Sequence, residues 1–267
     1  MARTTGCDVS HWQGDIDFYK MKAAGAEFVF IKASQYNWKD SKFIQNWARS
    51  KEAGLLRGPY HFADYNRPAP LQAEYFASLI GADLGELPPV LDYEMFSAWG
   101  TPDPKNNTQW IKEFVEAWPI DCPLMLYTNP ANIKYNLHVH EWMLDLDLWI
   151  AHYLNLPALR TLTFAPWPKW TFWQYGTPVV GEKYGAQSKE LDMNYFNGDL
   201  LELKAYSNAT MGQEPPPIDP EPPVEVPCCC DVSCCDSSCC NQEELAVEHR
   251  KLQSELNLLS DRIGELE

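Results

Sequence analysis

Basic residues are scarce in this sequence of 267 residues, and it contains no long apolar run. Its 21 lysines and arginines are outnumbered by 37 aspartates and glutamates, which gives a net charge of −16 at pH 7. Binding to nucleic acid needs a basic surface, so the composition argues against a nucleic-acid partner. Because no stretch of 18 apolar residues exists, we expect no membrane span. We also expect synthesis in the cytoplasm, because residues 1–5 lead into a strand-like segment without the apolar region of a signal peptide.

Cysteine is nearly absent from the first 213 residues and is concentrated after them. Cys7 and Cys122 stand alone, without Cys-x-x-Cys spacing, and we expect each to be an inert buried thiol. Seven other cysteines lie in residues 228–240. Seven of the thirteen residues in 215–227 are proline, which favours a stiff, extended spacer of about 40 Å at ~3.1 Å per residue. We therefore expect four parts: a globular domain (1–213), a Pro-rich linker (214–227), a Cys-rich segment (228–240) and a C-terminal helix (241–267).

Short β-rich apolar runs alternate with amphipathic segments through the globular domain. This alternation predicts parallel strands joined by helical crossovers. About eight strands in about 205 residues indicate an α/β fold, an irregular TIM-like βα barrel whose later helices are short or missing. The expected strands are 5–10, 28–34, 58–62, 90–95, 124–128, 148–152, 171–175 and 191–195, and the expected helices lie near 18–24, 42–53, 71–80 and 105–117.

Four carboxylic acids stand at the ends of expected strands, where such barrels carry their chemistry. Asp8 lies in the first strand, Asp92 and Glu94 in the fourth, and Asp192 in the last. Asp92 and Glu94 are two residues apart, so they share one face of their strand. Two like charges in a partly dry pocket cannot both ionise easily, so one pKa should rise and leave a proton donor beside an anion. Glycoside hydrolysis uses this pairing.

A pair of acids alone is weak evidence for catalysis. Asp92 and Glu94 taken by themselves are more often solvated carboxylates or metal ligands. The two further acids at other strand ends, with aromatic residues beside each, favour the catalytic interpretation. With only six histidines in the chain, we expect no transition-metal site.

Aromatic residues are abundant, at 13% of the chain. Such richness suits a site that stacks on flat ligands such as sugar rings, although many of these side chains will be core. Trp167, Trp170 and Trp173 could line such a site, but about half of such rings serve packing. We expect His61, within a strand, to be structural.

Eight motifs follow one another in order through residues 4–205. They are GCDVSHWQG (6–14), FIKAS (30–34), GPYHF (58–62), LDYE (91–94), LYTN (126–129), LWIA (148–151), WQYG (173–176) and LDMN (191–194). In these motifs the chain resembles glycoside hydrolase family 25 lysozymes. The resemblance ends by about residue 213.

The resemblance implies an N-acetylmuramidase that cuts the β-1,4 bond between N-acetylmuramic acid and N-acetylglucosamine in peptidoglycan. Glu94 matches the family's general acid. Asp92 matches a carboxylate that either acts as the nucleophile or positions the N-acetyl group of the substrate to attack. Asp8 and Asp192 match acids with electrostatic and orienting roles. The residues that match the lining of the sugar cleft are Tyr60, Tyr127, Trp149 and Gln174.

Lys32 faces the acids of the expected barrel. A neutralising role for this lysine is as well founded as a direct role in binding or catalysis. No cofactor is expected.

Two classes of function remain open at this point. The first is a lytic enzyme, either a phage lysin or a component of a virion, made in the host cytoplasm and acting on the cell wall after release. The second is a non-catalytic, oligomeric spike that binds cell-wall carbohydrate through the same barrel. The four intact acids favour the enzyme.

The C-terminal helix carries a heptad pattern, which predicts a dimer or trimer through residues 241–267. The alternative is a single amphipathic helix that docks on the barrel. A parallel coiled coil would gather copies of residues 228–240, which favours interchain disulfides, with a thiolate metal cluster as the rival. The d positions are Leu245, Leu252, Leu259 and Leu266, and the a positions are His249, Leu256 and Ile263.

Overall fold

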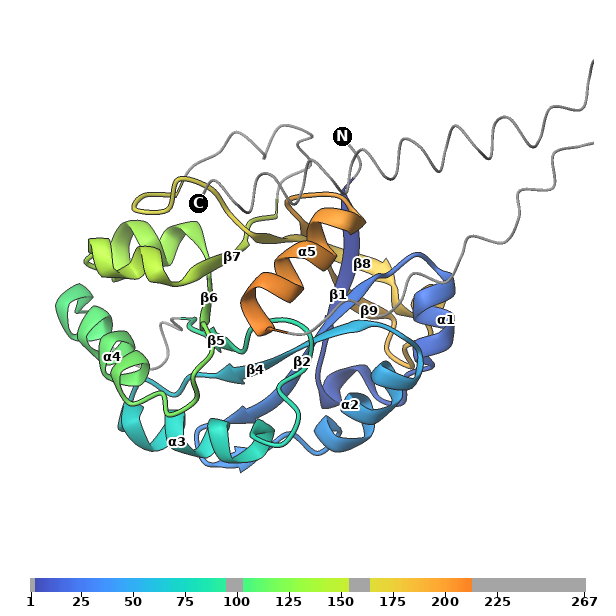
Figure 1. Cartoon of the computed structure of the whole chain (residues 1–267), viewed down its shortest axis with the longest axis horizontal. Coiled ribbons are helices and arrows are strands. Elements are labelled where there is room, and N and C mark those ends of the chain that lie inside the picture. Colours follow the sequence, from blue (N-terminus) through green and yellow to red (C-terminus); the bar gives the residue numbers. More distant parts are fainter. Residues whose placement is uncertain (1–2, 95–102, 154–163, 213–267) are drawn as a thin grey trace, which may run out of the picture. The chain divides into compact units, whose positions relative to one another are not determined.

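The computed structural model describes residues 3–94, 103–153 and 164–212 (Figure 1). The expected linker, Cys-rich segment and C-terminal helix lie outside the described residues. Within the described ranges, no helix is both long enough and apolar enough to span a membrane.

Eight strands form a closed barrel, as the sequence predicts. In the described part of the chain, β1 pairs with both β2 and β9, so the sheet closes on itself, and the short β3 pairs only with β2. The order around the barrel is β1-β9-β8-β7-β6-β5-β4-β2. The strands are β1 (Thr4–Val9), β2 (Phe28–Gln35), β3 (Trp38–Lys39), β4 (Leu56–Phe62), β5 (Val90–Asp92), β6 (Met125–Thr128), β7 (Asp147–Ala151), β8 (Phe172–Val180) and β9 (Glu190–Phe196).

The prediction of parallel strands is wrong for β9. This strand runs antiparallel to both of its neighbours, β8 and β1, whereas the other neighbouring pairs of the barrel are parallel. The connection from β8 to β9 holds only nine residues, four of which form the 3-10 turn η6 (Gly181–Tyr184). A parallel crossover needs a dozen residues or more, so the chain returns as a hairpin. Asp192 consequently pairs in register with Asp8.

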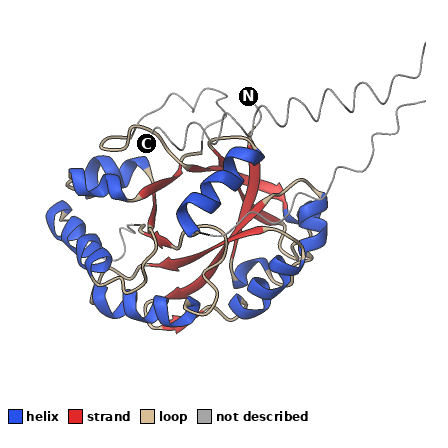
Figure 2. Ribbon diagram, in the orientation of Figure 1, coloured by secondary structure: helices blue, strands red, loops and turns tan. Residues whose placement is uncertain are grey.

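Helices lie outside the strands, as Figure 2 shows. Four of them match the expected segments: α1 (Phe18–Ala23), α2 (Phe43–Glu52), α3 (Ala69–Ile80) and α4 (Pro104–Glu116). Between β6 and β7 there are only a π-helical turn, η3 (Asn132–Asn136), and a 3-10 turn, η4 (Glu141–Asp145), which confirms that a later helix is short.

A fifth helix, α5 (Leu200–Met211), was not expected from the sequence. It begins with a capping box in which Asp199 and Glu202 each accept a backbone N–H of the other. Leu203 of this helix packs into the inner core with Phe28 and Phe172, which lie at the starts of their strands. Helix α5 therefore closes the end of the barrel opposite the carboxyl ends of the parallel strands.

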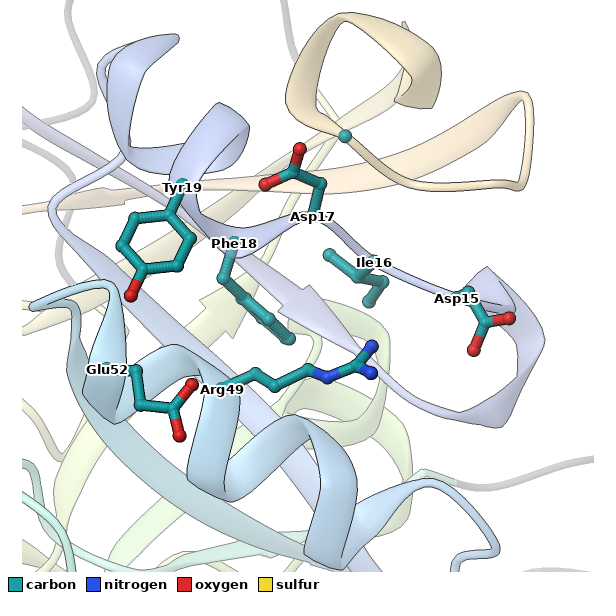
Figure 3. Close-up of a pocket in the computed structure, with 8 residues that line it drawn as sticks. Asp15, Ile16, Asp17, Phe18, Tyr19, Arg49 and Glu52 are labelled. Carbon is teal, nitrogen blue, oxygen red and sulfur yellow. The ribbon is translucent and has the colours of Figure 1, made fainter.

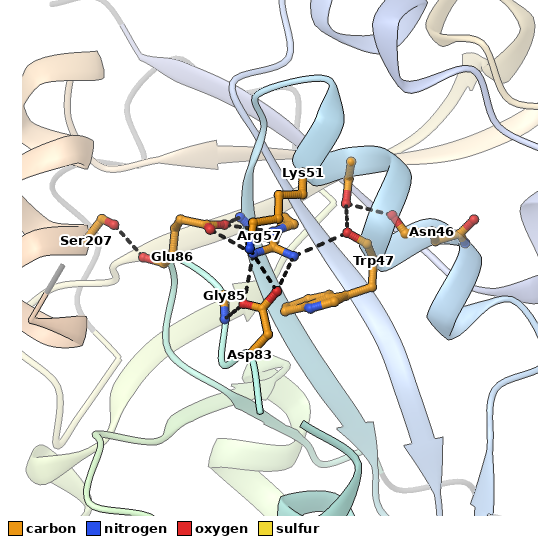
Figure 4. A network of polar contacts seen from close by, with 9 residues as sticks. Asn46, Trp47, Lys51, Arg57, Asp83, Gly85, Glu86 and Ser207 are labelled. Atoms are coloured by element: carbon orange, nitrogen blue, oxygen red, sulfur yellow. Dashed lines mark hydrogen bonds and ion pairs between the residues drawn. The ribbon is translucent and has the colours of Figure 1, made fainter. Parts of the chain in front are cut away.

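A buried arginine joins several elements near the closed end (Figure 4). The side chain of Arg57, at the start of β4, is fully buried and binds the carboxylates of Asp83 and Glu86 at 2.8–3.0 Å. Its guanidinium also lies 4.4 Å from the ring centroid of Trp47 in α2. Ser207 of α5 donates to the carbonyl of Glu86, so this network links α2, β4, the following loop and α5.

The structure shows which aromatic residues and histidines belong to the core. Trp167, Trp170 and Trp173 are all buried in the core, and none of them lines the cavity that contains the four acids. His61 is structural, as expected: it is fully buried, with Ser34 Oγ 2.8 Å from Nδ1 and Gln72 Oε1 3.0 Å from Nε2.

The two isolated cysteines differ. Cys7 is fully buried beside Met193, as expected. Cys122 is only half-buried, because it lies in the loop between α4 and β6 rather than in a strand, so the expectation of a buried thiol is wrong there.

Candidate active site

All four acids named from the sequence line one cavity at the carboxyl ends of the parallel strands. Asp8 lies on β1, Asp92 is the last residue of β5, Glu94 follows two residues later, and Asp192 lies on β9. The cavity measures about 230 Å³. Its lining is Asp8, Ser10, Trp12, Gln13, Lys32, Tyr60, Phe62, Asp92, Glu94, Tyr127, Trp149, Tyr153, Gln174 and Asp192.

The five further residues expected at the cleft, Lys32, Tyr60, Tyr127, Trp149 and Gln174, also line this cavity. Sequence reasoning missed Trp12 and Tyr153, which lie on its rim and are 76% and 62% exposed. Both follow directly after strands that carry site residues, β1 and β7. Their position at strand ends is the signal that could have found them.

Two side-chain amides hold Asp8 in place. Gln174 Nε2 donates to Asp8 Oδ2 at 2.9 Å, and Asn194 Nδ2 donates to the same oxygen at 2.7 Å. The motif that ends the family resemblance contains Asn194, but its contact with Asp8 spans 186 residues of sequence.

Aromatic side chains orient these amides. Trp149 Nε1 donates to Asn194 Oδ1 at 2.8 Å, which turns the amide nitrogen of Asn194 toward the aspartate. The hydroxyls of Tyr127 and Tyr153 both donate to Gln174 Oε1 at 2.9 Å. Trp149 and Tyr127 are almost fully buried, so they act on the amides more than on a ligand.

Burial raises the pKa of every one of the four acids, and repulsion from a neighbouring carboxylate adds to it. Burial, together with the charge of Asp192, raises the pKa of Asp8 to about 7, although its two amide donors act in the opposite direction. Burial first, and then the charge of Asp192, raises the pKa of Glu94 to about 6. The pKa of Asp92 rises well above its ordinary value through burial and the charge of Glu94. Burial and the nearby Glu190 raise the pKa of Asp192.

The pKa of Glu94 is raised, as the sequence predicts for a member of the Asp92–Glu94 pair. The sequence pointed to Asp92 as the neighbour that acts on Glu94. In the structure the charge of Asp192 also raises the pKa of Glu94, and the repulsion between Glu94 and Asp92 raises the pKa of Asp92.

One oxygen of Asp92 has no protein partner. Its Oδ1 is buried, and none of the described residues donates a hydrogen bond to it. An unsatisfied buried acceptor costs about 1–3 kcal/mol, so such atoms are rare outside functional sites. This atom belongs to a residue that lines the cavity.

Lys32 is the one lysine or arginine among the described residues that line the cavity. Its Nζ donates to Gln35 Oε1 at 2.9 Å and lies 4.6 Å from the ring centroid of Phe62. Burial lowers the pKa of Lys32, while the charges of Asp92 and Asp40 raise it. In return, the lysine lowers the pKa values of Asp92 and Glu94. Lys32 therefore partly neutralises the acids, which agrees with the neutralising role among the two that the sequence suggests.

A larger cavity of about 480 Å³ lies elsewhere, between α1 and α2. Figure 3 shows Arg49 extended across it beneath Phe18. Its acid Asp15 is solvent-exposed, and a hydrogen bond from Lys42 lowers the pKa of that carboxyl. A lowered pKa is the reverse of what a proton donor needs. The smaller cavity, whose four acids have raised pKa values, is therefore the candidate active site.

The comparisons with known proteins agree with this assignment. The profile of Glycosyl hydrolases family 25 matches residues 7–180. The chain is 35% identical over 219 residues to Lysozyme M1 of Streptomyces globisporus, covering 77% of this chain and 71% of that protein.

Solved structures show the same similarity. The bacterial lysozyme from Streptomyces coelicolor aligns with a TM-score of 0.67 at 32% identity, covering 79% of this chain and 99% of that one. A family 25 glycosyl hydrolase from Bacillus anthracis aligns with a TM-score of 0.65 at 28% identity, covering 76% and 93% of the two chains.

Proposed function

The chain belongs to Glycosyl hydrolases family 25 and is a glycoside hydrolase, and from this premise we propose that it cleaves the β-1,4 bond between N-acetylmuramic acid and N-acetylglucosamine in peptidoglycan. The observation that carries the proposal is the cavity in which Asp8, Asp92, Glu94 and Asp192 meet with raised pKa values. A protonated carboxyl beside ionised ones is what glycoside hydrolysis requires. The similarity to Lysozyme M1 supports peptidoglycan as the substrate.

Glu94 is the general acid in this proposal. With a pKa of about 6, it retains its proton in about half of the molecules at pH 6 and in about one in ten at pH 7, and it can deliver that proton to the leaving oxygen. The charge of Asp192 supports this role, because it makes ionisation of Glu94 less favourable.

Asp92 acts at the anomeric carbon of the sugar, whereas Glu94 acts at the leaving oxygen. Its carboxylate, which lines the cavity, can either attack the anomeric carbon or accept the N–H of the substrate's acetamido group, which orients that group for attack. Lys32 assists by favouring the ionised form of this carboxyl.

Asp8 and Asp192 have electrostatic and orienting roles. Asp8 is fixed by the two amides of Gln174 and Asn194, so its position changes little when substrate binds. Both acids add negative potential where positive charge develops on the sugar ring in the transition state.

The overall charge of the protein does not assist substrate capture. A net charge of −16 cannot steer an anionic wall polymer toward the site over long range. Affinity must therefore come from local hydrogen bonds and ring stacking within and around the cavity.

The experiment that tests the proposal compares the full chain with Glu94→Gln on purified cell walls. The variant keeps the shape of the side chain and removes its proton, so wall clearing should fall by about 10²–10⁴-fold. Its melting temperature should stay at or above that of the parent chain, because a buried ionisable group has been removed. Near-parental clearing by Glu94→Gln would exclude this residue as the acid. Binding to walls without clearing by the parent chain would instead favour the non-catalytic spike, which nothing in the site or the comparisons supports.

We propose, from sequence alone, that residues 241–267 associate into a dimer or trimer and that residues 228–240 form interchain disulfides in an oxidising medium. The heptad leucines and the seven clustered cysteines support this. The full chain should run as a covalent oligomer on non-reducing gels and as a monomer with reductant. A monomer under both conditions, and by light scattering, would refute the proposal. A phage or virion origin, with action on the wall after release, stays a prediction.

A further inference from the structure

An unusual group of aromatic rings is exposed beside the active-site cavity. Trp12 is 76% exposed and Trp38 is 42% exposed, whereas Trp149, Trp170 and most other described tryptophans are buried. The ring of His11 lies between these two, with centroid distances of 4.6 Å to Trp12 and 6.4 Å to Trp38. We call His11, Trp12 and Trp38 the aromatic ledge.

The ledge is held in place from below. His11 Nδ1 and Asp40 Oδ2 are 2.6 Å apart, and the same oxygen accepts the backbone N–H of His11. The side chain of Asp40 is fully buried. Lys32 Nζ lies 5.3 Å from the ring centroid of Trp38 and joins the ledge to the cavity.

The turn that carries Trp12 is also fixed. It is the 3-10 helix η1 (His11–Gln13), closed by a capping box between Ser10 and Gln13. Two backbone N–H groups, from Gln187 and Ser188, donate to the carbonyl of Gln13. Gly14 follows with φ of +69°, a left-handed conformation that glycine adopts readily. A large apolar ring kept exposed on a fixed turn is preorganised for a ligand, since little conformational freedom is lost on binding.

The size of the cavity shows that a polymer must extend beyond it. At about 230 Å³ the cavity is smaller than the about 300–1,000 Å³ of ordinary ligand pockets. Trp12 lines the cavity and also belongs to the ledge, so the two surfaces are continuous. Another part of the lining is Tyr153, whose hydroxyl donates to Gln174.

We propose that the aromatic ledge binds a neutral N-acetylhexosamine residue of the glycan strand, beyond the two sugars that flank the cleaved bond. The inference rests on the proposed function, because it takes the substrate to be a polymer of amino sugars. The flat rings of Trp12 and Trp38 offer the apolar surface on which a pyranose ring stacks, and the imidazole of His11 supports the first of them.

The test compares Trp12→Ala and Trp38→Ala with the parent chain, each as the full chain, on two substrates. One substrate is long, uncrosslinked glycan strands, and the other is a wall disaccharide that holds only the two sugars joined by the cleaved bond. A stacking contact of about 1–1.5 kcal/mol corresponds to roughly a tenfold change in affinity. We expect KM on long strands to rise about tenfold in each variant. On the disaccharide, kcat/KM should fall by no more than about twofold, because this substrate does not reach the ledge. Trp12→Phe should recover most of the loss.

Tyr19→Ala is the matched control. Tyr19 is 64% exposed, lines the other cavity and belongs to no part of the proposed site, so its replacement should leave both substrates unaffected. Equal losses on both substrates, or losses in the ledge variants no greater than in Tyr19→Ala, would overturn the ledge.

A second measurement separates this inference from the proposed function. If the parent chain cuts neither substrate, the proposed function fails. Titration of Glu94→Gln with chitin tetrasaccharide, followed by tryptophan fluorescence, still tests the ledge. The ledge predicts that the Kd rises about tenfold when Trp12→Ala is added to Glu94→Gln. An unchanged Kd contradicts it.

Discussion

The pKa of each acid in the active site depends on the charges of neighbouring residues. Asp192 raises the pKa of Glu94, Glu94 raises that of Asp92, and Lys32 opposes both effects. Each acid therefore has a function that depends on the charge of another. Replacing one acid should change the pH dependence of the reaction as well as its rate.

We expect Asp192→Asn to shift the alkaline limb of the profile of kcat/KM against pH to lower values. The substitution removes the negative charge that makes ionisation of Glu94 unfavourable, so the pKa of Glu94 falls from about 6 toward its ordinary value of 4.5. Fewer molecules are then protonated at pH 6–7, and activity there declines further than at pH 5. Initial rates on soluble wall fragments, measured between pH 4 and 8, provide the readout.

Glu190→Gln supplies the control for that experiment. Glu190 is an exposed residue of the same strand, and its charge acts on Asp192 rather than on Glu94. The alkaline limb of the Glu190→Gln profile should stay within about 0.3 pH units of the limb of the parent chain. An unshifted limb in Asp192→Asn would show that Asp192 does not control the proton on Glu94.

Single residues of the site were predictable where strand position alone decides the side-chain direction. The placement of Asp8, Asp92 and Asp192 on strands suffices to bring them to one cavity. The expected position of Glu94 within a strand is wrong, because β5 ends at Asp92 and Glu94 reaches the cavity from the following segment. The support that Asn194 gives to Asp8 was not predictable. It depends on the register between β1 and β9, which no local pattern reveals.

At the scale of elements, the strands were predicted closely because each is a short apolar run bounded by polar or turn-forming residues. Helix α5 was not predicted. Its apolar residues Leu200, Leu203 and Tyr206 recur every third residue, but the exposed Leu201 lies outside this stripe and weakens the pattern. The direction of β9 followed from the length of one connection, which the alternation pattern does not take into account.

The network around Arg57 provides the prediction at this scale. Replacing this arginine by leucine leaves Asp83 and Glu86 without their cation and removes the link between β4 and the loop after α3. Both acids are partly exposed, at 36% and 21%, and water can rehydrate them. We therefore expect the free energy of unfolding to fall by about 2–3 kcal/mol, below the range for a fully buried pair. Urea denaturation measures this change.

Lys51→Met serves as the matched control for Arg57→Leu. Lys51 pairs with the same carboxylate of Asp83 at 3.2 Å, but its side chain is 61% exposed. Its loss should change the stability by less than about 1 kcal/mol. Equal effects of the two substitutions would mean that the buried network does not hold these elements together.

At the scale of the whole molecule, the buried acids make the stability of the barrel depend on pH. The pKa of Asp8 is about 7 and that of Glu94 about 6 in the folded state, both above their ordinary values of 3.8 and 4.5. The folded state therefore binds more protons than the unfolded state between about pH 4 and 7. Their contribution to stability is fully present below about pH 4 and is lost as the pH rises through 6–7.

We expect the melting temperature of the parent chain to be lower at pH 8 than at pH 5. In Asp8→Asn this difference should shrink, because the group whose pKa is raised to about 7 has been removed. Thermal melts of both proteins at the two pH values measure the effect. Comparing the two proteins separates the effect of Asp8 on the melting temperature from that of the general repulsion within an acidic surface. The same pH difference in both would show that Asp8 is not buried as a titrating group.

The central claim is that the cavity of four acids cuts the glycan strand at the reducing side of N-acetylmuramic acid. The most direct measurement is digestion of purified peptidoglycan, reduction of the products with borohydride and mass spectrometry of the fragments. The account predicts that the new reduced ends are muramitol and that Glu94→Gln produces none of them. Reduced ends of glucosaminitol, or fragments released without any new reducing end, would contradict it.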